Sequence, residues 1–502
     1  MPDRSGWVCA VCDRWAAPGL ARPPPAAPPI RMSHSPPDPA PHPAPAPAPE
    51  PVVEPVVEQP TDPERPNVVV IGAGFAGLSF CKRFRGRPGG AEIVLIDRQN
   101  HHLFQPLLYQ VAMAALSATD IAAPIRSVMS RRPDITSLLA DVTGIDPARK
   151  RVLTTEGDVA YDYLVLAAGG RTSYFGNDHW EQHAPGLKTL DDALRIRRNV
   201  LTAFERAETT LETQEQERLM TIVIVGGGPT GVELAGSMAE LIHRVFKRDF
   251  RRIDVKTARV VLIESNPRLL KVYPESLSES ARHQLESLGV EVRLGVRVSD
   301  VDARGVELND GTRIETRSVL WGAGVAASPL TDAFPDAPRD RGGRIEVLPD
   351  LSVPGHPEVF AVGDLIRLTD PDGQEVPGVA PAAMQSGKHA AKLIAAELRD
   401  GPRPPAERPS FDYWDKGSMA TIGRRRAVAW FGKLRFGGLL AWLAWLGVHL
   451  MFLVSFRSKV SVFIQWCYAY LSFGRGARII TPSPAVRQEA EEPASGKKPS
   501  RV

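Results

Sequence analysis

The sequence has little cysteine and little net charge. Its 502 residues include four cysteines, Cys9, Cys12, Cys81 and Cys467, which are too few and too scattered for a disulfide framework. The 61 basic and 58 acidic side chains nearly cancel, so we expect no nucleic-acid partner. The first 30 residues lack a basic stretch followed by an unbroken apolar run. We therefore expect no secretory signal and a protein that works in the cytoplasm.

Both ends of the chain differ in composition from its centre. Residues 1–66 hold 20 of the 46 prolines, and a Pro, Ala and Glu composition favours an extended, disordered tail. Cys9 and Cys12 have C-x-x-C spacing, but no second pair completes a zinc site, so we expect no metal. Residues 481–502 are again polar. The folded part is predicted to span 67–480.

Short apolar runs rich in β-branched residues alternate with helix-length segments in this folded part. Such alternation predicts parallel sheets with crossover helices. Segments 151–170 and 305–324 share one pattern, a polar hairpin followed by an apolar strand that ends in small residues. The sequence therefore predicts an α/β fold with two Rossmann-like dinucleotide-binding domains. The predicted strands lie at 68–74, 92–97, 163–170, 221–228, 259–265 and 318–324.

The first motif is IGAGFAGL, which places Gly72, Gly74 and Gly77 between a predicted strand and a helix. The first glycine allows a tight turn, the second lets backbone amides approach a pyrophosphate, and the third lets helix and strand pack. Asp97 closes the next strand, 20 residues after Gly77. Its carboxylate is a candidate ligand for ribose hydroxyls.

The second motif is IVGGGPTGVELAG, which repeats the pattern with Gly226, Gly228 and Gly231. Its second strand ends in Glu264. A carboxylate there accepts hydrogen bonds from a ribose 2′-hydroxyl and repels a 2′-phosphate, so we expect NADH rather than NADPH. Arg268 lies four residues further on and is interpreted as a loop cation.

Two dinucleotide-binding motifs in one chain resemble flavoproteins whose first domain holds FAD and whose inserted domain holds NAD(P)H. Within that superfamily the chain is similar to the type II NADH:quinone oxidoreductases, which are single-subunit alternative NADH dehydrogenases. The stretches that carry this resemblance are HHLFQPLLYQVAMAALS (101–117), GGGPTGVELAG (226–236), FKRDFRRID (246–254), WGAGV (321–325) and YWDKGSMATIGRRRAVA (413–429).

The resemblance implies that the chain passes two electrons from NADH through FAD to a membrane quinone, menaquinone or ubiquinone, without pumping protons. It also implies a homodimer. In the stretch EVFAVGD (358–364), Asp364 is expected to begin a helix and to face the flavin's ribityl and pyrophosphate groups. The remaining cofactor-binding candidates are Gln105, Ala168, Gly169, Gly324 and Gly363.

The candidate quinone site departs from the family's pattern. That family carries two glutamines in an AQxxxQ box, whereas this chain has Pro381 at the first position and Gln385 at the second. Quinone recognition is expected to depend on Gln385, near Met384, or on backbone amides. Glu233, one turn into the second motif's helix, is the other catalytic candidate. The alternative for Glu233 is a carboxylate that only complements the helix dipole.

Residues 416–480 differ in charge from the rest of the chain. They contain ten Lys or Arg and no Asp or Glu, and five of the nine tryptophans fall between Trp414 and Trp466. Cations interleaved with aromatics favour a lipid bilayer surface. Residues 436–456 are uncharged and about 31 Å long as a helix, so a single transmembrane helix is the alternative to in-plane insertion. A buried core or dimer helix is a third reading. We expect a peripheral protein on the cytoplasmic face of the cell membrane.

Two functions other than NADH:quinone oxidoreduction stay open. One is a soluble NAD(P)H-dependent ferredoxin- or thiol-type reductase, and the other is a redox-sensing nucleotide-binding protein without turnover. The missing flavin-side cysteines and the basic, aromatic C-terminal region disfavour the first.

The assignments above give the expected order of parts along the chain. The predicted parts are a tail (1–66), the first part of an FAD domain (67–190), an NADH domain (191–340), the second part of the FAD domain (341–410), a membrane-anchoring region (411–480) and a tail (481–502).

Overall fold

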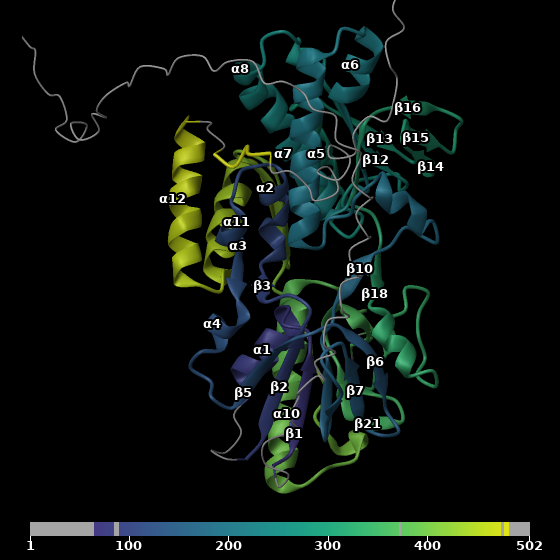
Figure 1. Ribbon diagram of the computed structural model, residues 1–502, viewed down its shortest axis with the longest axis vertical. Helices are drawn as coiled ribbons and strands as arrows, with labels where there is room; N and C mark the ends of the chain where they lie inside the picture. The colour runs from purple at the N-terminus through teal and green to yellow at the C-terminus, as the bar shows by residue number, and fades with distance from the viewer. Residues whose placement is uncertain (1–64, 85–89, 371–372, 473–475, 481–502) are drawn as a thin grey trace, which may run out of the picture. The chain divides into compact units, whose positions relative to one another are not determined.

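The computed structural model describes residues 65–84, 90–370, 373–472 and 476–480. Apart from residues 65 and 66, the two predicted tails lie outside the described residues, and so do Cys9 and Cys12. Within the described part, the chain forms two sheets with crossover helices, of which the second is parallel and the first is parallel except for its edge strand β20 (Ser352–Val353), and a C-terminal region (Figure 1). The predicted α/β class with two Rossmann-like units is therefore confirmed.

The first sheet has six strands in the order β20-β21-β9-β1-β2-β5. Every residue of β1 is buried, as expected for a central parallel strand covered on both faces. The chain leaves this sheet after β9 and returns to it with β20 and β21, so the second sheet is inserted between them. The strands are β1 (Asn67–Ile71), β2 (Glu92–Asp97), β5 (Ile135–Leu139), β9 (Tyr163–Leu166), β20 (Ser352–Val353) and β21 (His356–Ala361).

The second sheet has four parallel strands in the order β13-β12-β11-β17. All five residues of β11 are buried, which repeats the situation of β1. The strands are β11 (Thr221–Val225), β12 (Arg259–Glu264), β13 (Val290–Leu294) and β17 (Ser318–Trp321).

A small antiparallel sheet precedes one strand of each parallel arrangement, β9 in the first sheet and β17 in the second. The sheet β6-β7-β8 leads into β9, and the sheet β14-β15-β16 leads into β17. This is the repeat that the sequence predicted. The strands are β6 (Val142–Asp146), β7 (Arg151–Thr154), β8 (Val159–Ala160), β14 (Val298–Asp302), β15 (Gly305–Leu308) and β16 (Arg313–Glu315).

The longer helices follow the strands in the expected places. Helix α7 continues into a π-helix, η3 (Leu241–Phe246), and then α8 (Lys247–Asp249), so the long segment before β12 is a helix end followed by a loop. The helices are α1 (Phe75–Arg83), α5 (Leu190–Thr209), α6 (Thr213–Met220), α7 (Pro229–Glu240), α9 (Glu275–Glu286) and α10 (Ala380–Asp400).

Two contacts link distant parts of the chain. Helix α10 packs along α1 (Figure 1), and a Cβ on Gly387 would lie 2.2 Å from the Ala76 oxygen, so the helices approach to backbone contact. Strand β10 (Gly170–Thr172) pairs antiparallel with β18 (Val325–Ala327), which joins the exits of β9 and β17. The carboxyl ends of both sheets therefore face one shared region.

Short elements complete the two units. They are β3 (His101–Leu103), η1 (Gln105–Leu107), α2 (Leu108–Ala112), α3 (Ala118–Ile121), β4 (Ala122–Pro124), α4 (Ile125–Met129), η2 (Asp178–Gln182), η4 (Val255–Thr257), η5 (Pro329–Ala333), β19 (Ile345–Glu346), η6 (Gly363–Leu365), β22 (Ile366–Arg367) and η7 (Pro405–Glu407).

The C-terminal region corrects one prediction. It contains a three-stranded antiparallel sheet, β23 (Ser418–Gly423), β24 (Arg426–Phe431) and β25 (Leu434–Gly437), before two helices, α11 (Gly438–Phe452) and α12 (Phe456–Ser472). The expected helix over 436–456 is wrong in its bounds, because α11 has 15 residues. None of the helices in the described ranges combines the length and apolar character needed to cross a bilayer.

Candidate active site

The first glycine of each motif ends a central strand in a left-handed conformation. Gly72 has φ +100° and Gly226 has φ +106°. A Cβ on Gly72 would lie 2.5 Å from the Ala167 oxygen, and one on Gly226 would lie 2.7 Å from the Ala323 nitrogen. Because both the φ angle and the neighbouring backbone exclude a side chain, only glycine fits either turn.

The third glycine of each motif lets the helix pack on the turn. A Cβ on Gly77 would lie 1.9 Å from the Gly72 oxygen, and a Cβ on Gly231 would lie 1.7 Å from the Gly226 oxygen. Both distances are much shorter than a van der Waals contact. Because the neighbouring atoms belong to the backbone, no side-chain rotation can relieve the clash. The third glycine therefore has the packing function that the sequence predicted.

The second glycine of each motif caps a helix and faces open space. Gly74 is the N-cap of α1 and Gly228 is the N-cap of α7. Among the described residues, no further heavy atom lies within 4 Å of a Cβ built on either glycine. The backbone amides at these helix N-termini can therefore be approached closely, and the helix dipole favours an anion there. The geometry of both loops fits a dinucleotide pyrophosphate.

The acid of the first motif holds its glycine-rich loop. Asp97 Oδ2 accepts a hydrogen bond from the Ala73 amide at 2.6 Å, and Oδ1 accepts one from the Gln99 amide at 2.7 Å. Burial raises the pKa of Asp97, while these two hydrogen bonds oppose the shift. The carboxylate lies beside the loop, as a ribose ligand must, and it also fixes the loop's middle residue.

The acid of the second motif makes the corresponding contacts. Glu264 Oε2 accepts from the Gly227 amide at 2.6 Å, and Oε1 accepts from the Asn266 amide at 2.7 Å and side chain at 2.6 Å. Ser265 Oγ also donates to Oε1 at 3.1 Å. Arg268 donates to backbone oxygens of Lys271 and Tyr273, so it is a loop cation as expected.

The other cofactor candidates gather where β9, β17 and β21 end. Ala168 and Gly169 follow β9, and Gly169 and Gly324 have φ +67° and +72°. The Gly363 amide donates to Ser386 Oγ at 3.1 Å.

Asp364 lies beside the turn that follows β9. A Cβ built on Gly170 would lie 3.7 Å from Asp364 Cβ. The prediction that Asp364 begins a helix is wrong, because Gly363–Leu365 is a single 3₁₀ turn followed by strand β22. The next long helix, α10, begins at Ala380.

The predicted quinone residues are on α10, but one of them is already hydrogen-bonded. Gln385 Nε2 donates to the Trp414 oxygen at 3.0 Å, and its Oε1 accepts from the Trp414 amide at 3.1 Å. Pro381 lies in the first turn of α10, where a missing N–H costs nothing. Met384 is half-buried one residue before Gln385. Gln105 lies apart on η1 and donates to the Lys188 oxygen at 3.2 Å.

Glu233 differs from a carboxylate that complements a helix dipole. Burial raises its pKa to about 8, and a backbone hydrogen bond from Thr421 on β23 opposes that shift. A dipole-stabilised carboxylate would instead have a lowered pKa. Burial raises the pKa values of Tyr109 and Tyr273, and the charge of Glu233 raises both further. Glu233 is thus a protonated acid near neutral pH that lies between α7 and the C-terminal sheet.

A polar bridge that the sequence analysis missed ties α12 to the first unit. Asp120 accepts from Ser461 Oγ at 2.7 Å and from Gln465 Nε2 at 2.8 Å. The neighbouring Trp466 Nε1 donates to Gln110 Oε1 at 2.8 Å. The local signal was readable, because Ser117 and Asp120 form a capping box around α3. Its partners, more than 300 positions away, were not.

The two cysteines in the described ranges have different surroundings, one buried and one exposed, and so differ from the paired thiols of a redox site. Cys81 is buried in α1, and burial raises the pKa of its thiol to about 12, which leaves it protonated. Cys467 is exposed on α12. A thiol-type reductase reaction needs a reactive thiolate, and the Cys81 environment disfavours one.

The chain is similar to known proteins over most of its described length. Residues 66–387 match the family model for pyridine nucleotide-disulphide oxidoreductases, and residues 415–476 match the model for the NDH2 C-terminal domain. The chain is 44% identical to the type II NADH:quinone oxidoreductase Ndh of Mycobacterium tuberculosis, over 84% of this chain and 92% of that protein.

The chain is also similar to more distant relatives. The mitochondrial internal alternative NAD(P)H-ubiquinone oxidoreductase A1 of Arabidopsis thaliana is 31% identical, over 82% of this chain and 85% of its own. The structure of NDH2 from Plasmodium falciparum in complex with NADH shares the fold, with a TM-score of 0.75, 20% identity, and coverage of 83% of this chain and 100% of that chain. The chain therefore belongs to the type II NADH:quinone oxidoreductases and is an enzyme that uses FAD and NADH.

Proposed function

We propose that the enzyme delivers electrons from NADH to a quinone in a membrane on which it lies through the outer faces of α11 and α12. The observation that carries this proposal is the apolar surface of these helices. Inward they bury Ala441, Trp442, Trp445, Val462 and Trp466 against the protein. Outward they expose Leu439, Leu440, Leu443, Met451, Phe452, Phe456, Val460, Phe463, Ile464, Tyr468 and Leu471.

The composition of this surface favours a lipid partner. Exposed apolar side chains of soluble proteins are usually scattered, whereas a contiguous set marks an interaction site. The flanking cations Arg457 and Lys459 and the tyrosine Tyr468 are residue types enriched at bilayer interfaces. Membrane association also fits the family to which the chain belongs.

The bridge between α12 and the first unit supports electron transfer from the flavin site to a quinone at this surface. Asp120 and Gln110, which bind α12, lie in the segment 101–121 that also carries His102. His102 Nδ1 lies 2.8 Å from the oxygen of Ala73, in the first glycine-rich loop. One continuous stretch of chain thus contacts both the proposed membrane helix and the proposed flavin loop.

We assign the cofactors by the geometry of the two loops. Gly72, Gly74, Gly77 and Asp97 would hold the FAD pyrophosphate and ribose, with Ala168, Gly169, Gly363, Asp364 and Gln105 around the rest of the flavin. Gly226, Gly228, Gly231, Glu264 and Gly324 would hold NADH. When bound, FAD supplies hydride acceptance and onward electron transfer.

The quinone contacts are assigned to residues of α7 and α10. Glu233 is the candidate proton donor, because its raised pKa keeps a proton available near neutral pH. Met384 and Gln385 remain the α10 candidates, although Gln385 must share or exchange its contact with Trp414. A menaquinone or ubiquinone acceptor, a lack of proton pumping, a homodimer and the cytoplasmic face of the membrane stay predictions.

The proposal is tested on the outer face of the helices. A triple variant Leu440→Gln, Phe463→Gln, Leu471→Gln removes side chains that are 68%, 54% and 85% exposed. Each loses about 1.5 kcal/mol or more of burial in lipid, so vesicle binding and long-chain quinone reduction should fall more than about tenfold. NADH oxidation by ferricyanide should persist.

A matched control removes three exposed apolar residues elsewhere, Leu139, Leu211 and Val272, each replaced by Gln. We expect no change in vesicle binding for this control. If the helix variant keeps its flavin but loses the ferricyanide reaction, the helices serve the hydride step instead. If NADH does not bleach the flavin absorbance of the unmodified protein, or a short-chain quinone does not restore it, the electron-transfer proposal fails.

A further inference from the structure

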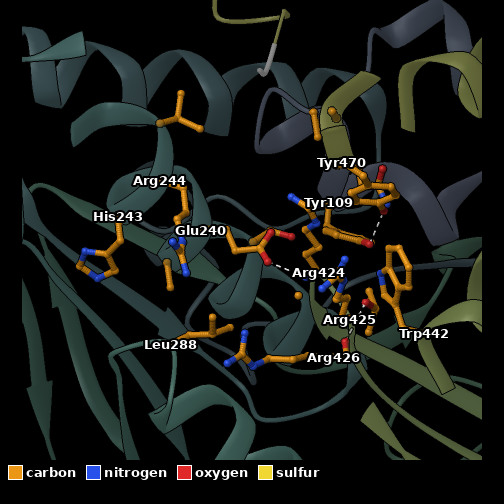
Figure 2. A pocket seen from close by; sticks show the side chains of 18 of the residues that line it. Tyr109, Glu240, His243, Arg244, Leu288, Arg424, Arg425, Arg426, Trp442 and Tyr470 are labelled. Atoms are coloured by element: carbon orange, nitrogen blue, oxygen red, sulfur yellow. Dashed lines mark hydrogen bonds between the residues drawn. The ribbon is translucent and has the colours of Figure 1, made fainter. Parts of the chain in front are cut away.

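A cavity of about 490 Å³ lies between the π-helix η3, the hairpin that joins β23 to β24, and the helices α11 and α12. Figure 2 shows its lining side chains. Arg244 comes from η3, Arg424, Arg425 and Arg426 come from the hairpin, and Trp442 and Tyr470 come from the two helices. The cavity plays no part in the nucleotide sites described above.

The cavity is strongly basic. Its lining includes four arginines and one carboxylate, Glu240. Glu240 Oε1 already accepts the Arg424 amide at 2.5 Å. Within the part of the chain that the structure describes, no carboxylate forms an ion pair with Arg425 or Arg426.

Several arginines within the described ranges are paired with acids. Arg408, for example, lies 2.9 Å from Asp350 and 2.6 Å from Glu397. The side chains of Arg425 and Arg426 therefore bring charge to the cavity without an acidic partner from the described residues. Such an arrangement favours a bound anion.

The hairpin tip is strained at one of these arginines. Gly423 pairs with Arg426, so Arg424 and Arg425 form a two-residue loop. Arg425 has φ +62°, a left-handed conformation that glycine or asparagine adopts more readily. Strain held at a surface turn is a reason to look for a function of the side chain.

The aromatic wall of the cavity adjoins the apolar surface of the helices. Trp442 and Tyr470 meet edge to face at 4.8 Å, and the Arg424 guanidinium lies 5.8 Å from the centre of the Tyr470 ring. Leu439 and Leu443, which flank Trp442 on α11, are exposed. A ligand in the cavity can thus extend along the apolar face.

We propose that this cavity binds the phosphate-bearing headgroup of an anionic phospholipid. The proposal rests on the membrane attachment proposed above and names a specific partner for it. Guanidinium groups bind phosphate oxygens in pairs, and Trp and Tyr side chains prefer the level of the headgroups. The acyl chains would then lie on the exposed face of α11 and α12.

The test compares two variants with the same change in net charge. Arg425→Asn with Arg426→Gln removes two cavity cations, and asparagine suits the left-handed turn, so folding is not compromised. Lys433→Asn with Arg435→Gln removes two exposed cations of the same region that do not line the cavity. Binding is measured on vesicles of phosphatidylcholine alone and of phosphatidylcholine with roughly one fifth phosphatidylglycerol.

We expect the cavity variant to lose about tenfold or more of the preference for anionic vesicles and the control to lose less than about threefold. Native mass spectrometry should find phosphatidylglycerol on the unmodified protein and not on the cavity variant. Reduction of a short-chain quinone in detergent should be equal in all three proteins. That last readout separates failure of this inference from failure of the proposed electron transfer.

Three results would overturn the inference. Equal losses in both variants would mean general attraction to the membrane rather than a site. Binding of inorganic phosphate to the unmodified protein, with no phosphatidylglycerol found by native mass spectrometry, would assign the cavity to a soluble phosphate compound. A changed oligomeric state of the cavity variant with unchanged vesicle binding would assign it to a contact between two copies of the chain.

Discussion

The two glycine-rich loops share three glycines but differ in the residue between the first two and in the acid that binds it. The first loop has Ala73 bound by Asp97, and the second has Gly227 bound by Glu264. A Cβ on Gly227 would lie 2.9 Å from both Cβ and Cγ of Glu264. Leu269 Cδ2 would lie closer still, at 2.6 Å, so the side chains of Leu269 and Glu264 together fill the space beside Gly227.

The two helices that follow these loops also dock on different partners. Helix α1 meets α10, where Gly387 contacts the Ala76 backbone. Helix α7 meets the C-terminal sheet, where a Cβ on Gly236 would lie 1.6 Å from the Ile422 oxygen. The helix after the proposed NADH loop thereby contacts the C-terminal sheet that precedes α11 and α12, whereas the helix after the flavin loop contacts α10. The same type of glycine-rich loop can therefore be linked to different parts of the molecule, depending on which element packs against the helix that follows it.

Substitution of the third glycine in each motif should have the largest effect and should show which cofactor each loop binds. Gly77→Ala places a Cβ against the Gly72 oxygen and Gly231→Ala places one against the Gly226 oxygen. Overpacking against backbone costs typically 1–3 kcal/mol or more. We expect Gly77→Ala to lose at least about nine tenths of its flavin, measured by absorbance per chain, and Gly231→Ala to keep its flavin but not be reduced by NADH. Loss of flavin from both would mean that the loops do not serve separate cofactors.

Substitution of the residue between the first two glycines should have unequal effects in the two loops. Gly227→Ala forces Glu264 aside, and at a cost of roughly 2 kcal/mol the KM for NADH should rise about thirtyfold. Ala73→Gly creates no clash, so the dissociation constant for FAD should change by less than about threefold. Steady-state kinetics and flavin titration measure the two effects. A KM for Gly227→Ala within twofold of the unmodified enzyme would contradict the steric coupling.

Coenzyme choice should depend on the second acid alone. Glu264→Ser removes the charge that repels a 2′-phosphate, so the NADPH to NADH ratio of kcat/KM should rise about tenfold. Asp97→Ser should lower flavin occupancy and melting temperature, because bound cofactor stabilises the fold, while leaving that ratio unchanged. An unaltered ratio in Glu264→Ser would remove Glu264 from coenzyme selection.

The smallest expected effect distinguishes the two helices by pH. Five residues after the second glycine, α1 carries Ser79 and α7 carries Glu233, whose pKa is raised to about 8 by burial. A carboxyl with a raised folded-state pKa binds a proton that the unfolded chain releases, so stability falls as pH rises from about 4.5 to about 8. Glu233→Gln should remove this slope, and the melting temperatures of variant and parent should diverge by a few degrees at pH 9. Parallel curves would show that Glu233 does not titrate in this range.

The sequence predicted the strands and loops well because their causes are local. The left-handed turn at Gly72 and the acid at the end of β2 are read from spacing, and the structure has strand ends within a few residues of those expected. The helix expected at Asp364 failed for a tertiary reason. Gly363, at φ +74°, turns the chain against α1 and α10, and β22 then pairs with β19.

The apolar run at 436–456 shows a second limit of sequence reading. Hydropathy counts apolar residues but does not say what they contact. Part of this run is strand β25, and Trp442 and Trp445 of α11 pack inward while Leu440 and Leu443 face outward. The amide pairing of Gln385 with Trp414, 29 positions away, was equally invisible.

The sequence by itself determined the two nucleotide loops, their acids and the family, because these depend on residue type and short spacing. Only the tertiary structure decided which groups from distant segments meet. It placed Glu240 beside Arg424, 184 positions along the chain, tied Asp120 to α12, and raised the pKa of Glu233 by burying it. Burial and long-range contact arise from how the helices and sheets pack, and no short stretch of residues contains that information.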